Sequence, residues 1–282
     1  MTACSPQVNN GWPIIEWDPA DIIRPSSNDT PPDYALLILN QPIHNHVGMI
    51  KTLWNNASFR IAADGATNCL HDVAGAHSDP SFDNLDVIIG DLDSISLVAR
   101  AYYETPPRRT SVIYHRDDYS TDFAKAVEHI RQRFTPPPPS SKPPKDIVAV
   151  GSLGGRVDHG LSQLHHLYLY QTDPDYRNGK MYFFSGESLT FMLKAGRKHI
   201  IRVRDDCPTG EESDDVFAKW VGILPVKEPS VITTKGLEWD VTDWPTEFGG
   251  QMSTSNHIRP ETQVVEIETT KDVLFTMSLR QT

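Results

Sequence analysis

The chain has 282 residues, of which 38% are hydrophobic, and its formal net charge at pH 7 is −11. This length and composition are typical of a globular protein with one large domain or two ordinary ones. The negative charge argues against sequence-independent binding to nucleic acids or anionic membranes, because both need a basic surface.

The first segment, residues 1–33, is acidic and rich in proline. A signal peptide needs a basic start and an apolar stretch, and transit peptides avoid acidic residues, so the segment fits neither. No apolar run approaches the ~20 residues of a membrane span. The three cysteines are far apart, which argues against a disulfide framework and favours a reducing compartment. We therefore expect a cytoplasmic protein with a polar, partly ordered leader whose sequence WPIIEW can dock on the body.

Five short apolar runs are typical of buried parallel strands. They are residues 34–40, 59–64, 85–91, 111–116 and 146–152. Such strands are continuously apolar because helices cover both faces of a parallel sheet. Helical patterns follow the last two runs, over residues 121–134 and 158–170, and Ser120 or Thr121 can cap the first helix. The alternation predicts a doubly wound, mostly parallel α/β nucleotide domain over residues 34–178.

The remaining sequence predicts an insertion and a second domain. The Pro-rich insertion at residues 135–145 is expected to form an exposed polyproline spacer. From residue 179 the pattern becomes typical of antiparallel strands. One face of the last strand carries Val273, Phe275, Met277 and Leu279. We expect a smaller antiparallel β domain, a sandwich or partial barrel, over residues 179–282, with an acidic mobile loop at 204–215.

Every predicted parallel strand ends in polar or glycine-rich sequence. Ligands of open α/β sheets bind outside the carboxyl ends of the strands, so these ends should meet at one rim. In chain order the ends carry Asn40 and Gln41; Asp64, Gly65 and Asn68; Asp91 and Asp93; Asp118, Ser120, Thr121, Asp122 and Lys125; and Gly154, Gly155, Arg156 and Asp158. Each group alone is as readily a turn, a cap or a solvated strand end. Five such groups on one rim favour a ligand site.

Carboxylates beside lysine and arginine have a simple explanation if the rim binds Mg²⁺ and a polyphosphate. Mg²⁺ prefers a few carboxylate oxygens together with water and phosphate oxygens. Glycines let backbone N–H groups approach phosphates, and helix N-termini favour anions. Lys125 in the first turn of its helix, and Arg156 just before the next helix, could neutralise phosphate charge.

Six motifs occur in the same order as in thiamine pyrophosphokinases, which the chain resembles over residues 34–282. They are ADGATN, GDLDSI, YSTDFAKA, GGRVDHGLSQL, GLEWDV and FGGQMSTSN. The resemblance implies that the pyrophosphoryl group of ATP is transferred to the hydroxyl group of thiamine, giving thiamine diphosphate and AMP with the help of Mg²⁺. It also implies a homodimer whose active sites are shared between subunits, and a β-sandwich domain that helps to bind thiamine.

The resemblance also assigns roles to individual residues. It makes Asp91, Asp93 and Asp122 the catalytic and metal-binding residues, and either Asp122 or Asp93 would accept the proton of the thiamine hydroxyl group. The other strand-end residues would contact the nucleotide or its phosphates. The implied thiamine contacts are Trp239, Ser253, Thr254, Ser255 and Asn256. An indole suits a flat pyrimidine and a cationic thiazolium, and short hydroxyls and an amide suit the aminopyrimidine edge.

The chain departs from the family pattern at four positions. Asp118 stands where Gln or Asn is frequent, Cys69 where Arg is common, Gln163 where Asn is usual, and Phe275 where Trp is common. These differences leave the implied reaction class unchanged but bear on the finer nucleotide contacts. We therefore carry over no role to Cys69 or Gln163.

Two other functions stay open on the sequence alone. An apolar strand followed by D-x-D also resembles haloacid-dehalogenase-like phosphatases, in which Asp91 would be the nucleophile. A non-catalytic sensor would bind thiamine or a nucleotide without turnover. A trapped aspartyl-phosphate would favour the phosphatase, whereas thiamine-dependent formation of AMP would exclude it.

Overall fold

The structure is a computed structural model of the chain. It describes residues 8–9, 11–25, 32–43, 46–77, 80–117, 119–135, 144–204 and 215–280. Most of the Pro-rich insertion (136–143), Asp118 and most of the acidic loop (205–214) lie outside the described residues. The chain divides into two compact units, an α/β unit of residues 23–186 and a β unit of residues 1–22 and 187–282.

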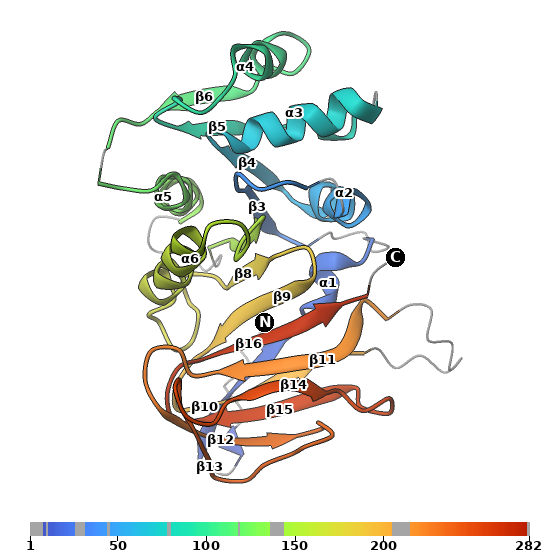
Figure 1. Ribbon diagram of the computed structural model, residues 1–282, viewed down its shortest axis with the longest axis vertical. Helices are drawn as coiled ribbons and strands as arrows, with labels where there is room; N and C mark the ends of the chain where they lie inside the picture. Colours follow the sequence, from blue (N-terminus) through green and yellow to red (C-terminus); the bar gives the residue numbers. More distant parts are fainter. Residues whose placement is uncertain are drawn as a thin grey trace, which may run out of the picture. The chain divides into compact units, whose positions relative to one another are not determined.

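The α/β unit is built on six parallel strands in the order β8–β7–β3–β4–β5–β6 (Figure 1). These strands are β3 (Tyr34–Ile38), β4 (Phe59–Ala63), β5 (Val87–Gly90), β6 (Ser111–Tyr114), β7 (Asp146–Val150) and β8 (Met181–Phe184). Every residue of β3 and β5 is buried, whereas the edge strand β6 is partly exposed. The predicted doubly wound parallel fold is thus confirmed.

Helices cover both faces of this parallel sheet. They are α2 (Val47–Asn56), α3 (Ala66–His77), α4 (Leu97–Glu104), α5 (Asp122–Phe134) and α6 (Val157–Tyr170). Helices α5 and α6 lie on one face, and α2 and α3 lie on the other (Figure 1). The direction of winding reverses between β3 and β7, which is where such sheets open a crevice for a ligand. No helix within the described ranges is long and apolar enough to cross a membrane.

Strand β8 is an element that the sequence analysis did not anticipate. Its four residues, MYFF, are all buried, and they pair in parallel with β7. The α/β unit therefore continues to Gly186, beyond residue 178, where a change to the β domain was expected. The run is too short and too uniformly apolar to show a period, and the Pro-, Asp- and Gly-containing segment before it is typical of a domain boundary.

The β unit contains two groups of strands. One sheet has the order β1–β2–β10–β15–β12–β13, and four antiparallel strands have the order β14–β11–β16–β9. Their bounds are β1 (Val8–Asn9), β2 (Trp12–Trp17), β9 (Ser188–Leu193), β10 (Arg197–Arg202), β11 (Phe217–Leu224), β12 (Ser230–Lys235), β13 (Trp244–Thr246), β14 (Ser253–His257), β15 (Val264–Thr269) and β16 (Val273–Leu279). The predicted inward face of β16 is buried throughout, as is its neighbour Leu274.

The leader sequence WPIIEW forms strand β2, which pairs with β10. The pairing is parallel, whereas the other described strand pairs of the β unit are antiparallel. Trp17 is buried, and its ring stacks on Phe191 with a centroid separation of 4.4 Å. Its Nε1–H donates to Nδ1 of the buried His199 at 3.0 Å. The leader therefore supplies part of the core of the β unit. A four-residue helix, α1 (Ala20–Ile23), follows it.

Candidate active site

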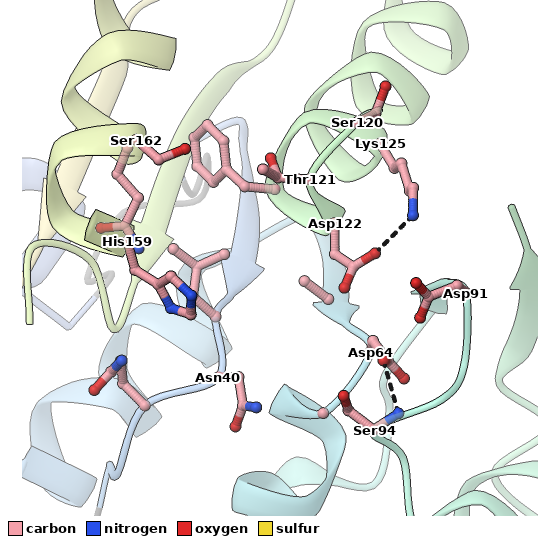
Figure 2. A pocket seen from close by; sticks show the side chains of 16 residues that line it. Asn40, Asp64, Asp91, Ser94, Ser120, Thr121, Asp122, Lys125, His159 and Ser162 are labelled. Carbon is pink, nitrogen blue, oxygen red and sulfur yellow. Dashed lines mark hydrogen bonds and ion pairs between the residues drawn. The ribbon is translucent and has the colours of Figure 1, made fainter. Parts of the chain in front are cut away.

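A cavity of about 320 Å³ opens where β3, β4 and β5 end (Figure 2). Its lining consists of Leu39, Asn40, Gln41, Ala63, Asp64, Gly65, Asp91, Ser94, Ser120, Thr121, Asp122, Phe123, Lys125, His159, Ser162 and Gln163. These residues end or follow the three strands, lie just before α5, or belong to the first two turns of α5 and α6. A cavity of this size falls in the range of small-molecule sites, and half of its lining consists of strand-end residues, as expected for an open α/β sheet.

Asp64, directly after β4, is the buried carboxylate of the cavity, with an exposed fraction of 1%. Its Oδ2 accepts a hydrogen bond from the backbone N–H of Ser94 at 3.1 Å, and its Oδ1 accepts one from Ile95 at 3.2 Å. Its φ is 38°, a left-handed conformation that non-glycine residues seldom adopt outside constrained sites. Burial raises the pKa of Asp64, and three neighbouring aspartates raise it further, although the hydrogen bond from Ser94 lowers it.

Asp91 and Asp93 follow β5 and form a carboxylate cluster with Asp64. One carboxylate oxygen of each lies within 4.8 Å of the others. Leu92 between the two has a φ of 60°, and the hydroxyl of Ser94 donates to Oδ1 of Asp93 at 2.8 Å. Three converging carboxylates are the donor set that a hard divalent cation such as Mg²⁺ prefers. The residues present therefore fit such a cation.

Asp122 begins α5 and approaches the cluster across Gly90. A Cβ at Gly90 would lie 2.7 Å from Cβ of Asp64 and 3.1 Å from Oδ1 of Asp122, so this close approach requires glycine. Lys125, which is 3% exposed, places its Nζ 3.1 Å from Oδ1 of Asp122 (Figure 2). Thr121 caps the helix by accepting from the N–H of Ala124 at 3.2 Å. A buried cation and a helix N-terminus thus offset part of the negative charge.

Two amide side chains hold the loops around the cavity. Asn68 does not line the cavity: its Nδ2 donates to the Ser94 carbonyl at 2.8 Å, and its Oδ1 accepts from the N–H of Ser96 at 2.9 Å. Gln163 does line it, and its Oε1 accepts from the N–H of Leu153 at 2.5 Å. Asn68, expected to contact the nucleotide, therefore uses its amide to fix the loop after β5.

The loop between β7 and α6 contributes less to the cavity than the sequence suggested. None of Gly154, Gly155, Arg156 and Asp158 belongs to the described lining. Instead, Arg156 and Asp158 pair with each other at the exposed surface, with Nη2 and Oδ2 2.7 Å apart. Exposed ion pairs are weak, so Arg156 is available to a competing anion. Gly155, with a φ of 71°, packs against Gln41, and a Cβ there would lie 2.4 Å from Nε2 of that side chain.

Several cavity residues were given no role from the sequence. His159 and Ser162 point into the cavity from α6, on the side opposite Asp91 and Asp122 (Figure 2). Ser94, whose backbone N–H bonds to Asp64, also lines it. The spacing of His159, Ser162 and Gln163 at i, i+3 and i+4 is a signal that could have placed them on one helical face.

In the β unit, the residues expected to bind thiamine lie on the loop that carries Trp239 and on β14. Trp239 is 55% exposed, and Asn256 is 5% exposed. The side-chain amide of Asn256 forms two hydrogen bonds with the backbone of Trp239. Its Oδ1 accepts from the N–H of Trp239 at 3.2 Å, and its Nδ2 donates to the carbonyl of Trp239 at 3.0 Å. Thr254 and Ser255 on β14 are exposed, whereas Ser253 is half-buried. Asn256 therefore positions the Trp239 loop, while the indole and the hydroxyls remain accessible.

The fold and the cavity define a class of enzyme. Carboxylates, a buried lysine and helix N-termini around one strand-end cavity are typical of enzymes that transfer a phosphate-containing group from a nucleotide with a divalent cation. Residues 50–177 match the family described as thiamin pyrophosphokinase, catalytic domain. Residues 198–274 match the thiamin pyrophosphokinase, vitamin B1 binding domain. The chain belongs to the thiamine pyrophosphokinase family.

Individual relatives agree with this family. The chain is 32% identical to thiamine pyrophosphokinase 3 of Oryza sativa subsp. japonica over 255 residues, covering 88% of this chain and 87% of the relative. It is 26% identical to thiamine pyrophosphokinase of Saccharomyces cerevisiae, covering 92% and 88%. The crystal structure of the yeast enzyme superposes with a TM-score of 0.77 at 24% identity, covering 95% and 91% of the two chains. The structure from Candida albicans gives 0.69 at 23% identity, covering 92% and 97%. Because both identities are below 25%, these superpositions show a shared fold and nothing further.

The reaction follows from this membership. The protein transfers the pyrophosphoryl group of ATP to thiamine, which gives thiamine diphosphate and AMP, and enzymes of this family use ATP together with a divalent metal. This confirms the function predicted from the six motifs. Neither the phosphatase with Asp91 as nucleophile nor the non-catalytic sensor has support in these comparisons.

The Gly90→Ala substitution tests whether the carboxylates work at the described separation. The added methyl group would push Asp64 and Asp122 apart, and a shift of about 1 Å can lower a rate by roughly 100-fold. We expect a loss of that order in kcat/KM, measured by AMP release. Gly75→Ala in α3 is the matched control, since a Cβ there meets nothing within 4 Å. Full activity of Gly90→Ala would show that the reaction does not depend on the described separation between Asp64 and Asp122.

Proposed function

We propose that Asp91 and Asp93 bind Mg²⁺ at the phosphates of ATP, with Asp64 and Asp122 beside them. The observation that carries this proposal is the convergence of the carboxylates of Asp64, Asp91 and Asp93 to within 4.8 Å. The resemblance pointed to Asp122 as the third ligand, whereas the geometry favours Asp64, because Asp122 already pairs with Lys125. A bound Mg²⁺ would neutralise charge on the phosphate oxygens and orient them.

The remaining cavity residues are proposed to position the two reactants. Lys125 and the N-terminus of α5 attract phosphate oxygens, and Arg156 can join them by leaving its exposed pair with Asp158. Asp122 or Asp93 accepts the proton of the thiamine hydroxyl group as the oxygen of that group attacks the β-phosphorus of ATP, and the bond from this phosphorus to the oxygen of the α-phosphate breaks, so that AMP leaves. Because the protein forms no covalent bond with the phosphate, most of the rate gain comes from positioning and charge stabilisation.

The nucleotide contacts are proposed to come from the other strand ends. Asn40 and Gln41 follow β3, and Gly65 begins the turn into α3. Gly65 packs tightly on Asn40: a Cβ at Gly65 would lie 2.6 Å from Nδ2 of Asn40, so glycine brings this backbone to the cavity wall. Ser120 and Thr121 add hydroxyl groups at the start of α5. We assign ATP binding to the domain of residues 34–178.

Thiamine is proposed to bind at the β unit, whose residues 187–282 make up most of the expected thiamine-binding domain of residues 179–282. The exposed indole of Trp239 suits the pyrimidine and the cationic thiazolium ring. The hydroxyl groups of Ser253, Thr254 and Ser255 suit the aminopyrimidine edge. The proposed protein is a cytoplasmic homodimer in which the α/β unit of one subunit and the β unit of the partner complete each active site.

The carboxylate pair gives the first test of this proposal. Asp91→Asn and Asp93→Asn should each lower kcat by at least about 100-fold, because losing one metal ligand removes several kcal/mol of transition-state stabilisation. Melting temperatures without metal should remain close to that of the unmodified protein. Asp175→Asn, at an exposed ion pair with Arg177 in the same unit, is the matched control and should retain activity. Near-normal turnover of both variants at saturating Mg²⁺ would refute the assignment.

The shared-site dimer is tested by mixing two inactive parents. One parent carries Asp91→Ala, and the other carries Trp239→Ala with Ser255→Ala. After random exchange of subunits at equal amounts, roughly half of the dimers are mixed, and each has one intact composite site. Activity should then recover to roughly a quarter of the normal value. If mixed dimers form, as judged by mass spectrometry of tagged subunits, and activity does not return, each site belongs to a single chain.

A further inference from the structure

The backbone of Trp239 is fixed on two sides. Asn256 bonds to its N–H and to its carbonyl, as described above. The carboxylate of Asp240 accepts hydrogen bonds from the N–H groups of Gly236 at 2.9 Å and Leu237 at 3.0 Å, which closes the loop that carries the indole. The freedom that remains to Trp239 is rotation of its side chain about χ1 and χ2.

The ring of His257 lies against the Trp239 indole. The ring centroids are 4.9 Å apart, and the planes are inclined by 48°. On its other side His257 contacts Trp220, its cross-strand partner on β11, at 4.3 Å and 75°. The His257 side chain is 17% exposed, so it is wedged between two indoles that are themselves about half exposed. This contact limits the rotation of Trp239.

Glu238 holds the imidazole of His257 in place. Its Oε2 lies 2.5 Å from Nδ1 of His257, and its backbone N–H donates to the carbonyl of His257 at 2.8 Å. The Glu238 side chain is 49% exposed and approaches from the solvent side, while Nε2 of His257 faces the protein interior. The two residues are thus tied together through both backbone and side chain, which fixes the ring orientation of His257.

We propose that His257, held by Glu238, is a positioning residue that keeps the Trp239 indole in the orientation that stacks on thiamine. The proposal rests on the proposed role of Trp239 in thiamine binding. A fixed indole loses little rotational freedom when the ligand binds, whereas a freely rotating one must be immobilised at that step. His257 and Glu238 therefore act on thiamine affinity and not on ATP or on the chemical step.

The test measures thiamine binding and kinetics in three variants. His257→Ala frees the indole and should raise both the Kd and the KM for thiamine about 5-fold, the factor expected when one large side chain must be immobilised on binding. Glu238→Ala should raise both about 3-fold, because it loosens the imidazole without removing it. Glu238→Gln keeps an oxygen that accepts from Nδ1–H and should bind thiamine nearly as well as the unmodified protein. The kcat and the KM for ATP should stay unchanged in all three.

The controls separate failure of this proposal from failure of the proposed function. Glu228→Ala breaks an exposed ion pair with Lys271 in the same unit and should leave thiamine affinity unchanged. If Trp239→Ala weakens thiamine binding but His257→Ala and Glu238→Ala do not, the positioning role is wrong and the stacking role stands. If Trp239→Ala has no effect on thiamine affinity, the stacking role itself is wrong. Should His257→Ala fail to fold, an unchanged Kd in Glu238→Ala alone overturns the positioning role.

Discussion

Two backbone hydrogen bonds to one buried carboxylate organise the carboxylate cluster at the strand ends of the α/β unit. The N–H groups of Ser94 and Ile95 donate to Asp64, and this ties the loop after β5 to the end of β4. Asp91 and Asp93 lie in that same loop, so their carboxylates stay near Asp64 despite the repulsion between like charges. Burial is the main cause of the raised pKa of Asp64, and repulsion from Asp122, then from Asp91 and Asp93, raises this pKa further against the lowering effect of the hydrogen bond from Ser94. A cation in the cluster would relieve the repulsion, which is why the arrangement suits metal-dependent chemistry.

In the β unit, the exposed indole of Trp239 is held by the residues around it. An exposed tryptophan normally samples several rotamers. Here the backbone on either side of Trp239 is bonded to Asn256, and the ring rests on His257. The core of the β unit includes Trp17 and Phe191, whose rings stack on each other. Both residues are distant in sequence from the loop that carries Trp239. Preorganisation of this kind favours binding of a flat ligand, because the ordering is done during folding.

The sequence predicted five of the six parallel strands and the helices α5 and α6, since continuous apolar runs and an amphipathic period are local signals. It also grouped Asp64, Asp91 and Asp122, because parallel strands end at one edge. It could not separate residues that face the cavity from residues that hold loops. Asn68 would lie at the start of α3 whether it faced the cavity or held a loop. Its hydrogen bonds to the backbone of Ser94 and Ser96 show that its amide holds the loop after β5.

Other features depend on contacts between residues distant in the chain. Strand β8 is recognisable only through its pairing with β7, since four apolar residues carry no period. Strand β2 in the leader is positioned by its pairing with β10, which lies more than 180 residues later in the chain. No local sequence pattern identifies β10 as its partner. His159 and Ser162 belong to the motif GGRVDHGLSQL, but the motif gave them no role, and it is their helical spacing with Gln163 that points all three to the cavity. These cases mark where tertiary contacts, and not local propensity, fix the outcome.

We propose that the carboxylates at the ends of β4 and β5 bind the divalent cation that accompanies ATP. A crystal structure with Mn²⁺ and a non-hydrolysable ATP analogue, with diffraction recorded near the manganese absorption edge, tests it most directly. We expect an anomalous peak in contact with the carboxylates of Asp91 and Asp93, with the triphosphate in the cavity beside Lys125. Manganese bound by the phosphates alone, or at another part of the chain with these carboxylates uncoordinated, would contradict the claim.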